Sequence, residues 1–175
     1  MSNTDLFFLI YNLNGKYWLL DQLMVFATSQ LIYLLILLIF VLGLKGTTKE
    51  KKALILIFLS IPIAVLLIKG IHLFYLENRP FVAYNLPLIV EEDINASFPS
   101  RHATISAIIA FAYTYFKSKW TIPFLLVALL IGISRIYVGV HYPLDVLGGF
   151  VTAIIALVIG LRVKQLLKIG LLKKS

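Results

Sequence analysis

The chain has 175 residues, of which 61% are hydrophobic and only 14% are charged. This composition excludes an ordinary water-soluble domain and is typical of a helical membrane protein. The net charge of +8 is also compatible with nucleic-acid binding, but most basic residues fall in loops between apolar runs. We therefore expect a lipid bilayer, and no nucleic acid, as the partner. The absence of cysteine excludes disulfides and thiolate metal sites.

All the predicted elements are helices. Residues 1–17 have a mixed composition and are expected to form a short helical segment at the membrane interface. Five apolar runs that are long enough, or nearly so, to cross a membrane follow at about 19–44, 53–76, 100–116, 120–140 and 144–161. We therefore expect an all-α polytopic membrane bundle of about five transmembrane helices. Residues 1–175 would form a single membrane-embedded domain that ends in a basic cytoplasmic tail, 162–175.

The basic residues predict how these spans are oriented. Eleven of the sixteen lie in alternate loops or after the last span, and so on one side: Lys45, Lys49, Lys51, Lys52, Lys117, Lys119, Arg162, Lys164, Lys168, Lys173 and Lys174. The positive-inside rule makes that side cytoplasmic. We expect a multi-pass plasma-membrane protein with its amino terminus outside and its carboxyl terminus in the cytoplasm. All three histidines, His72, His102 and His141, then lie at the outer face.

Three adjacent acids, Glu91, Glu92 and Asp93, share the outer side in the loop from 78 to 99. No histidine is near them in sequence, and three adjacent carboxylates alone are a poor ligand set for a metal ion. We interpret this loop as solvated and expect no chemistry from its acids.

A first polar cluster stands at the outer end of the second predicted span. Lys69 and His72 are three residues apart and share one helix face, and Arg79 follows in the loop. An arginine presents a planar, permanently charged fork to phosphate oxygens. The alternative for Lys69 is a side chain that merely extends from the helix end to the membrane surface.

A second polar cluster begins the third predicted span. Ser100, after Pro99, is expected at the N-cap of that helix, where free amides and the helix dipole favour an anion. A helix from Ser100 to Phe116 is only about 25 Å long, which is short for a hydrocarbon core of about 30 Å. Its start should therefore be recessed, with His102 in a sheltered vestibule. The alternative for His102 is a capping or packing role.

The third polar cluster connects the last two predicted spans. Arg135 ends one span, His141 lies in the short turn, and Asp145 falls in the first turn of the next helix. A carboxylate four residues after a histidine can accept the proton of one imidazole nitrogen and leave the other as a base or nucleophile. The alternative is a structural ion pair between Asp145 and Arg135.

The three clusters together resemble the signature of the type 2 phosphatidic acid phosphatase superfamily, which this chain carries as Arg79-Pro80, Pro99-Ser100-Arg101-His102, and Ser134-Arg135 followed by His141 and Asp145. The order and the intervals suit that family, with 18 residues between Pro80 and Pro99 and 31 between His102 and Ser134.

Two positions depart from the family pattern. The family usually has lysine seven residues before its first arginine, where this chain has His72, with Lys69 one helical turn earlier. The family usually has glycine between the serine and histidine of the second cluster, where this chain has Arg101. Arg101 should narrow the pocket or add a cationic contact.

The resemblance implies a metal-independent phosphatase that needs no cofactor and works through a phosphohistidine. His141 would attack the terminal phosphorus, Asp145 would hold its imidazole, and His102 would protonate the departing oxygen. The other polar residues would bind the phosphoryl oxygens: Arg79, Ser100 and Arg135, with Arg101 and Lys69 or His72 in support.

A site recessed in the outer leaflet favours a lipid substrate whose tail stays in the membrane. Within the superfamily, the segments 79–82 and 97–100 are most similar to the undecaprenyl-diphosphate phosphatases of the bacitracin-resistance type, which regenerate the lipid carrier for cell-wall synthesis. Phosphatidylglycerophosphate, phosphatidate and other isoprenyl diphosphates suit the same residues. The alternative from another class is a non-catalytic membrane protein that binds or transports anions.

Overall fold

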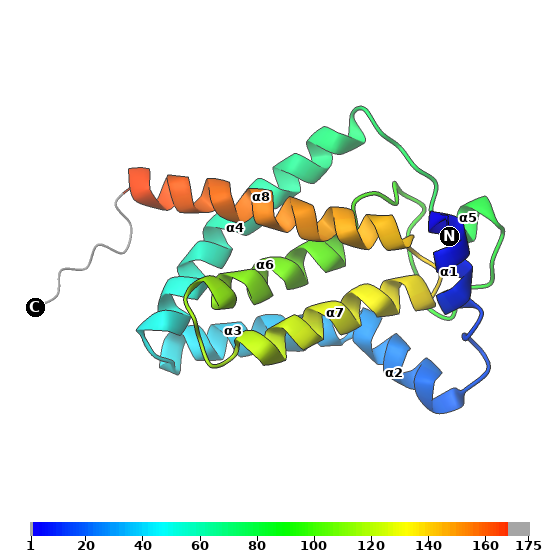
Figure 1. Ribbon diagram of the computed structural model, residues 1–175, viewed down its shortest axis with the longest axis horizontal. Helices are drawn as coiled ribbons and strands as arrows, with labels where there is room; N and C mark the ends of the chain where they lie inside the picture. The colour runs from blue at the N-terminus through cyan, green and yellow to red at the C-terminus, as the bar shows by residue number, and fades with distance from the viewer. Residues whose placement is uncertain (1, 168–175) are drawn as a thin grey trace, which may run out of the picture.

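The computed structural model describes residues 2–167, and in this range the chain forms eight helices and no strand (Figure 1). The helices are α1 (Asn3–Tyr11), α2 (Trp18–Ser29), α3 (Leu31–Lys45), α4 (Thr48–His72), α5 (Pro80–Ala83), α6 (Arg101–Tyr115), α7 (Thr121–Tyr137) and α8 (Pro143–Leu166). The prediction of an all-α membrane architecture is confirmed.

The predicted spans correspond to α2 with α3, and to α4, α6, α7 and α8. The first of them differs from expectation, because the chain breaks at Gln30 and the two halves form an angle of 52°. This bend lets α2 pack on α7 while α3 packs on α4. Among the described residues, α4 and α8 are each long and apolar enough to cross a membrane, and the bent pair together makes a third such segment. The count of five spans stays a prediction.

The helix α6 lies at the centre of the bundle, between α4, α7 and α8 (Figure 1). Small residues fill much of its surface, and Ala103, Ala107, Ala110 and Ala112 are fully buried. Small side chains allow close approach of neighbouring helices in a membrane protein. The central helix is therefore held on several faces, which fixes the position of its first turn.

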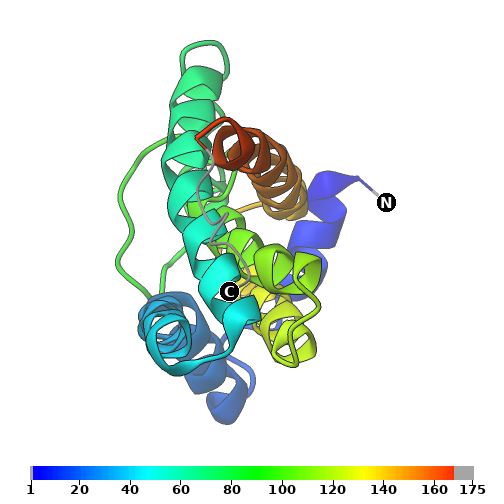
Figure 2. The same ribbon diagram turned by 90° about the vertical axis from the view of Figure 1, so that its left-hand side faces the viewer.

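Three helix ends meet at one end of the bundle, on the right of Figure 1: the start of α6, the end of α7 and the start of α8. In the view of Figure 2, α4 passes on one side of α8 and α1 lies on the other. The first turn of α6 is capped by Ser100, whose side chain accepts from the amide of Ala103, as predicted. Pro143 is the first residue of α8. The capping serine and the proline thus begin α6 and α8 at the same end of the bundle.

The basic loops meet at the opposite end of the bundle. Lys49 Nζ donates to the carbonyl of Lys117 at 2.9 Å, and Ser118 Oγ donates to the carboxylate of Glu50 at 2.5 Å. Lys164 Nζ lies 5.0 Å from the centre of the Phe116 ring. The grouping of these cations at one end agrees with the assignment of their loops to one side of the membrane.

The last helix extends beyond the predicted end of the last span, and the boundary between that span and the basic tail stays a prediction. The helix α8 continues through Arg162 and Lys164 to Leu166 instead of ending near Leu161. Arginine and lysine are good helix formers, so a change to polar composition does not by itself end a helix. Lys168, Lys173 and Lys174 lie outside the described residues.

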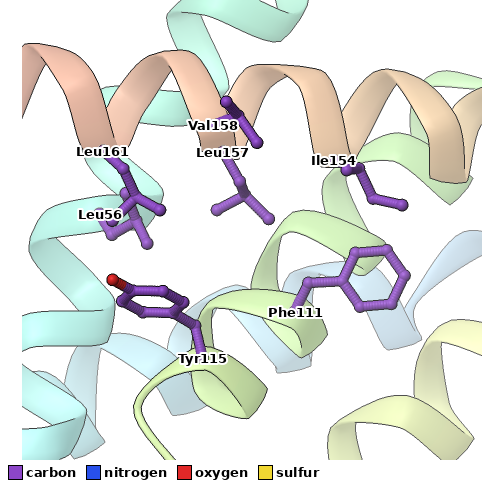
Figure 3. A pocket seen from close by; sticks show the side chains of 7 residues that line it. All are labelled: Leu56, Phe111, Tyr115, Ile154, Leu157, Val158 and Leu161. Atoms are coloured by element: carbon purple, nitrogen blue, oxygen red, sulfur yellow. The ribbon is translucent and has the colours of Figure 1, made fainter.

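An apolar cavity of about 230 Å³ lies between α4, α6 and α8, toward the basic end. Figure 3 shows Leu157 and Leu161 extending from α8 toward α6, and the full lining is Leu56, Phe111, Tyr115, Ile154, Leu157, Val158 and Leu161. The only polar side-chain atom of this lining is the Tyr115 hydroxyl oxygen. We assign no chemistry to this cavity.

The close packing of α8 on α6 is testable at Gly149. A Cβ atom at Gly149 would lie 2.8 Å from the carbonyl oxygen of Ser100. Replacing Gly149→Ala should therefore destabilise the bundle by about 1–3 kcal/mol, the usual cost of overpacking, and lower the melting temperature in detergent. Gly70→Ala is the matched control, because a Cβ at Gly70 meets none of its described neighbours within 4 Å. Equal melting temperatures for the two variants would contradict the packing.

Candidate active site

The three converging helix ends carry polar side chains into an otherwise apolar bundle. The amide of Ser100, at the start of α6, donates to the carbonyl of Asp145, at the start of α8, at 3.0 Å. The amides of Val140 and His141 both donate to the carbonyl of Arg135, which closes the turn after α7. The backbone itself thus holds the second and third predicted clusters side by side.

His141 and Asp145 form the predicted pair. Nδ1 of His141 lies 3.4 Å from Oδ2 of Asp145, and the two side chains are only 2% and 0% exposed. The same carboxylate oxygen accepts from the Ser97 hydroxyl at 2.5 Å and from the amide of Tyr142 at 2.7 Å. Asp145 therefore orients the imidazole of His141 and also caps the first turn of α8.

Burial, followed by the nearby charges of Arg135 and Arg79, lowers the pKa of His141 well below its ordinary value. The imidazole of His141 is therefore neutral at neutral pH. Nδ1 of His141 lies 3.4 Å both from Oδ2 of Asp145 and from the Ser97 hydroxyl oxygen, which itself donates to Asp145. These two acceptors favour a proton on Nδ1, which leaves the lone pair of the neutral ring on Nε2.

Two arginines from different segments lie beside this pair. Arg79 is 2% exposed and donates from Nη2 and Nε to Oδ1 of Asn95, at 2.6 and 3.0 Å. Arg135, at the end of α7, donates from Nη1 to the Thr28 hydroxyl of α2 at 2.9 Å. Both guanidinium groups are therefore buried and held in place by neutral oxygens.

Glu92 lies between these two arginines. Its carboxylate forms an ion pair with Arg79, 3.3 Å from Nη1, and a second one with Nη2 of Arg135. The side chain of Glu92 is only 13% exposed. Burial opposes its charge, but Arg135 and Arg79 outweigh this effect and hold the pKa of Glu92 below its ordinary value.

The interpretation of this loop as solvated is therefore wrong for Glu92. Two buried cations in a medium of low dielectric constant require a counter-charge, and the loop folds inward to provide it. Glu91 and Asp93 are exposed, as expected. The alternative ion pair between Asp145 and Arg135 is not formed within residues 2–167, because Arg135 pairs with Glu92 instead.

The remaining predicted residues divide into two groups. Ser100 is fully buried at the N-cap of α6, and His102 is partly buried in the first turn. Lys69, His72 and Arg101 instead line a separate cavity of about 300 Å³ between α4 and α6. Nε2 of His72 lies 3.0 Å from the carbonyl oxygen of Phe98, so His72 is engaged by the segment that precedes α6.

Four residues that the sequence interpretation gave no role take part in this arrangement: Thr28, Glu92, Asn95 and Ser97. Ser97 was detectable in principle, because it belongs to the segment 97–100 that carries the family resemblance. Thr28 reaches Arg135 from 107 positions away in the sequence. No local pattern indicates such a contact.

The site as a whole concentrates positive charge beside the imidazole of His141. Within residues 2–167, no group of three or more His, Cys, Asp or Glu side chains is placed to hold a metal ion. Two guanidinium groups and the first turn of α6 suit an anion with several oxygens, such as phosphate.

An arrangement of this kind in an all-helical membrane bundle is that of an integral membrane phosphatase. Residues 52–168 match the PAP2 superfamily. The chain belongs to this superfamily, and the resemblance predicted from the sequence is confirmed.

Similar proteins agree with this assignment. The chain is 35% identical to the undecaprenyl-diphosphatase BcrC of Bacillus subtilis (strain 168), over 95% of this chain and 86% of the relative. It is 33% identical to the putative undecaprenyl-diphosphatase YbjG of Escherichia coli (strain K12), over 79% of this chain and 70% of the relative. Among solved structures, Aquifex aeolicus LpxE matches with a TM-score of 0.66 and 30% identity, covering 91% of this chain and 94% of LpxE.

The bridge made by Glu92 is testable with Glu92→Gln, which keeps the shape and removes the charge. Breaking a fully buried ion pair costs about 3–5 kcal/mol, and the partial exposure of Glu92 should make the loss smaller. We expect a lower melting temperature in anion-free detergent buffer. Inorganic phosphate should then raise the melting temperature of this variant more than that of the unmodified protein.

Glu91→Gln is the control for this measurement, because it removes the same charge from an exposed neighbour. It should leave both the melting temperature and its response to phosphate unchanged. An identical phosphate response in Glu91→Gln and Glu92→Gln would contradict the role of Glu92 as the counter-charge.

Proposed function

We propose that the protein hydrolyses undecaprenyl diphosphate to undecaprenyl phosphate and inorganic phosphate, without a metal, at the outer face of the plasma membrane. The observation that carries this proposal is the buried pair of His141 and Asp145 beside Arg79 and Arg135. The similarity to undecaprenyl-diphosphatase BcrC over nearly the whole chain supports the choice of substrate.

The reaction has two steps. Nε2 of His141 attacks the terminal phosphorus, and a nitrogen–phosphorus bond forms as the bond from that phosphorus to the bridging oxygen breaks. His102, protonated once the negatively charged diphosphate is bound, gives its proton to the bridging oxygen, which leaves as part of undecaprenyl phosphate. A water molecule then attacks the phosphohistidine, and His102 takes the water's proton. Phosphate is released and His141 is free again.

Arg79 and Arg135 stabilise the negative charge that spreads over the transferred phosphoryl group. In the structure, the carboxylate of Glu92 interacts with both guanidinium groups. The phosphoryl oxygens would replace this carboxylate when the substrate binds. Asp145 keeps the proton on Nδ1 of His141 and stabilises the positive charge that the ring acquires during attack.

The outer location of the site rests on the distribution of charge. The basic loops meet at the end of the bundle opposite His141, and basic loops are retained in the cytoplasm. The amino terminus would then lie outside and the carboxyl terminus in the cytoplasm. An outer active site suits a lipid whose diphosphate is exposed at that surface.

The substrate proposal is tested by phosphate release in detergent from undecaprenyl diphosphate, farnesyl diphosphate, phosphatidate and phosphatidylglycerophosphate, with and without a chelator. We expect the isoprenyl diphosphates to have the highest kcat/KM, with no effect of the chelator. Higher values for the glycerolipids would overturn the substrate, and a requirement for divalent metal would overturn the mechanism. No release from any of the four would overturn the enzymatic proposal.

The two histidine roles are distinguished by trapping the phosphoenzyme. His141→Ala should form no acid-labile phosphoenzyme, because the attacking nitrogen is absent. His102→Ala should lower turnover by about 10²–10⁴-fold, the usual contribution of a general acid. The decrease in turnover should be smaller for a substrate whose leaving group needs no proton. Trapped phosphate in His141→Ala, or full activity in His102→Ala, would refute the corresponding role.

The topology is tested with single cysteines, since the chain contains none. Asp93→Cys, in the exposed loop near the site, should react with an impermeant thiol reagent in intact cells. Lys51→Cys, at the basic end, should react only after the cells are opened. The reverse pattern would invert the proposed orientation.

A further inference from the structure

A second cavity adjoins the site between α4 and α6, with a volume of about 300 Å³. Its wall is apolar over most of its length, with Ile61, Ala64, Val65 and Ile68 from α4 and Ile105 from α6. Val65 is exposed on the outer surface of the bundle. The cavity is therefore suited to a hydrocarbon chain that extends from the surrounding lipid.

One end of this cavity is cationic. Lys69 from α4 and Arg101 from α6 both line it, and no acidic residue is part of the lining. His72 also lines this end, but its Nε2 is occupied by the carbonyl of Phe98. Lys69 and Arg101 are exposed side chains that can orient toward an anion. This end of the cavity is complementary to a negatively charged group.

Asn95 connects the cavity to the site of Arg79. It lines the cavity, and its Oδ1 accepts from two nitrogens of Arg79, at 2.6 and 3.0 Å. Burial lowers the pKa of Arg79 to about 10. The carboxylate of Glu92 opposes this change, whereas the positive charges of Arg135 and Arg101 lower the pKa further. Asn95 is therefore shared between the cavity and the hydrogen bonds that hold Arg79.

We propose that this cavity is a second substrate subsite, in which Lys69 and Arg101 bind the phosphate that stays on the lipid and the apolar wall holds the first isoprene units. The transferred phosphate would lie beyond Asn95, between Arg79 and Arg135. This inference rests on the proposed function, because only a diphosphate places a retained phosphate next to the transferred one.

The subsite gives the enzyme a means of selecting diphosphates. A monophosphate with the same tail places its single phosphate between Arg79 and Arg135. It has no second phosphate for Lys69 and Arg101 to bind. A charged hydrogen bond contributes about 1.5–3 kcal/mol, or roughly a 10- to 100-fold change in kcat/KM. The departure from the family pattern at position 101 would then serve the retained phosphate.

The test compares farnesyl diphosphate with farnesyl monophosphate in the full-length protein in detergent. Lys69→Gln and Arg101→Gln should each lower kcat/KM for the diphosphate by at least about 10-fold, with less than about 3-fold change for the monophosphate. Lys16→Gln is the matched control, because Lys16 is an exposed lysine outside the cavity, and it should change neither. Equal decreases in kcat/KM for both substrates, or no decrease for either, would overturn the proposed subsite.

The apolar wall is tested separately with Val65→Phe, at an exposed position that should tolerate a larger side chain. It should lower kcat/KM for farnesyl diphosphate and leave that for p-nitrophenyl phosphate, which has no isoprenyl tail, unchanged. An unchanged value for farnesyl diphosphate would overturn the placement of the tail. Absence of phosphate release from any lipid diphosphate by the unmodified protein would instead overturn the proposed function, independently of these variants.

Discussion

Arg79 and Arg135 place two permanent charges at the end of a bundle that is otherwise apolar. Removing a guanidinium group from water is costly unless hydrogen bonds and a counter-charge compensate. The protein meets this requirement with oxygens from distant segments: Asn95 and Glu92 from the loop before α6, Thr28 from α2, and the carbonyl of Val140. These contacts hold the loop before α6 and the end of α2 against the two arginines.

The helix starts determine where the chemistry takes place. A capping serine begins α6 and a proline begins α8, and the amide of Ser100 bonds to the carbonyl of Asp145. This contact places the first turn of each helix beside the other. His141 lies in the turn just before α8, so the same backbone arrangement brings both histidine-bearing segments to one end of the bundle.

The parts of the site that the sequence predicts are those with local signals. Ser100 as an N-cap follows from its place between proline and an apolar run, and the pairing of His141 with Asp145 follows from a spacing of four residues across a helix start. Glu92 has no such signal, because its partners are 13 and 43 residues away and only the folded loop brings them together. In sequence, a buried counter-ion and a solvated acid look the same.

The fold shows the same division between local and tertiary information. Apolar run length predicts the order and the approximate positions of the main helices, because each run buries a helix surface. The break at Gln30 is not predicted, since neither glycine nor proline occurs there and the bend arises from packing on two different partners. The continuation of α8 past Leu161 is also not predicted, because polar residues can extend a helix into water.

The hydrogen bonds at the basic end have a mechanical consequence for α4. Lys49 and Glu50 tie its first turn to the connection between α6 and α7, whereas the chain just beyond its last turn is open, with Phe74 92% exposed. The last turn itself is still linked to the segment before α6, because Nε2 of His72 lies 3.0 Å from the carbonyl oxygen of Phe98. The helix α4 is therefore tied to both connections of α6, so the cavity between the two helices lies between two fixed ends.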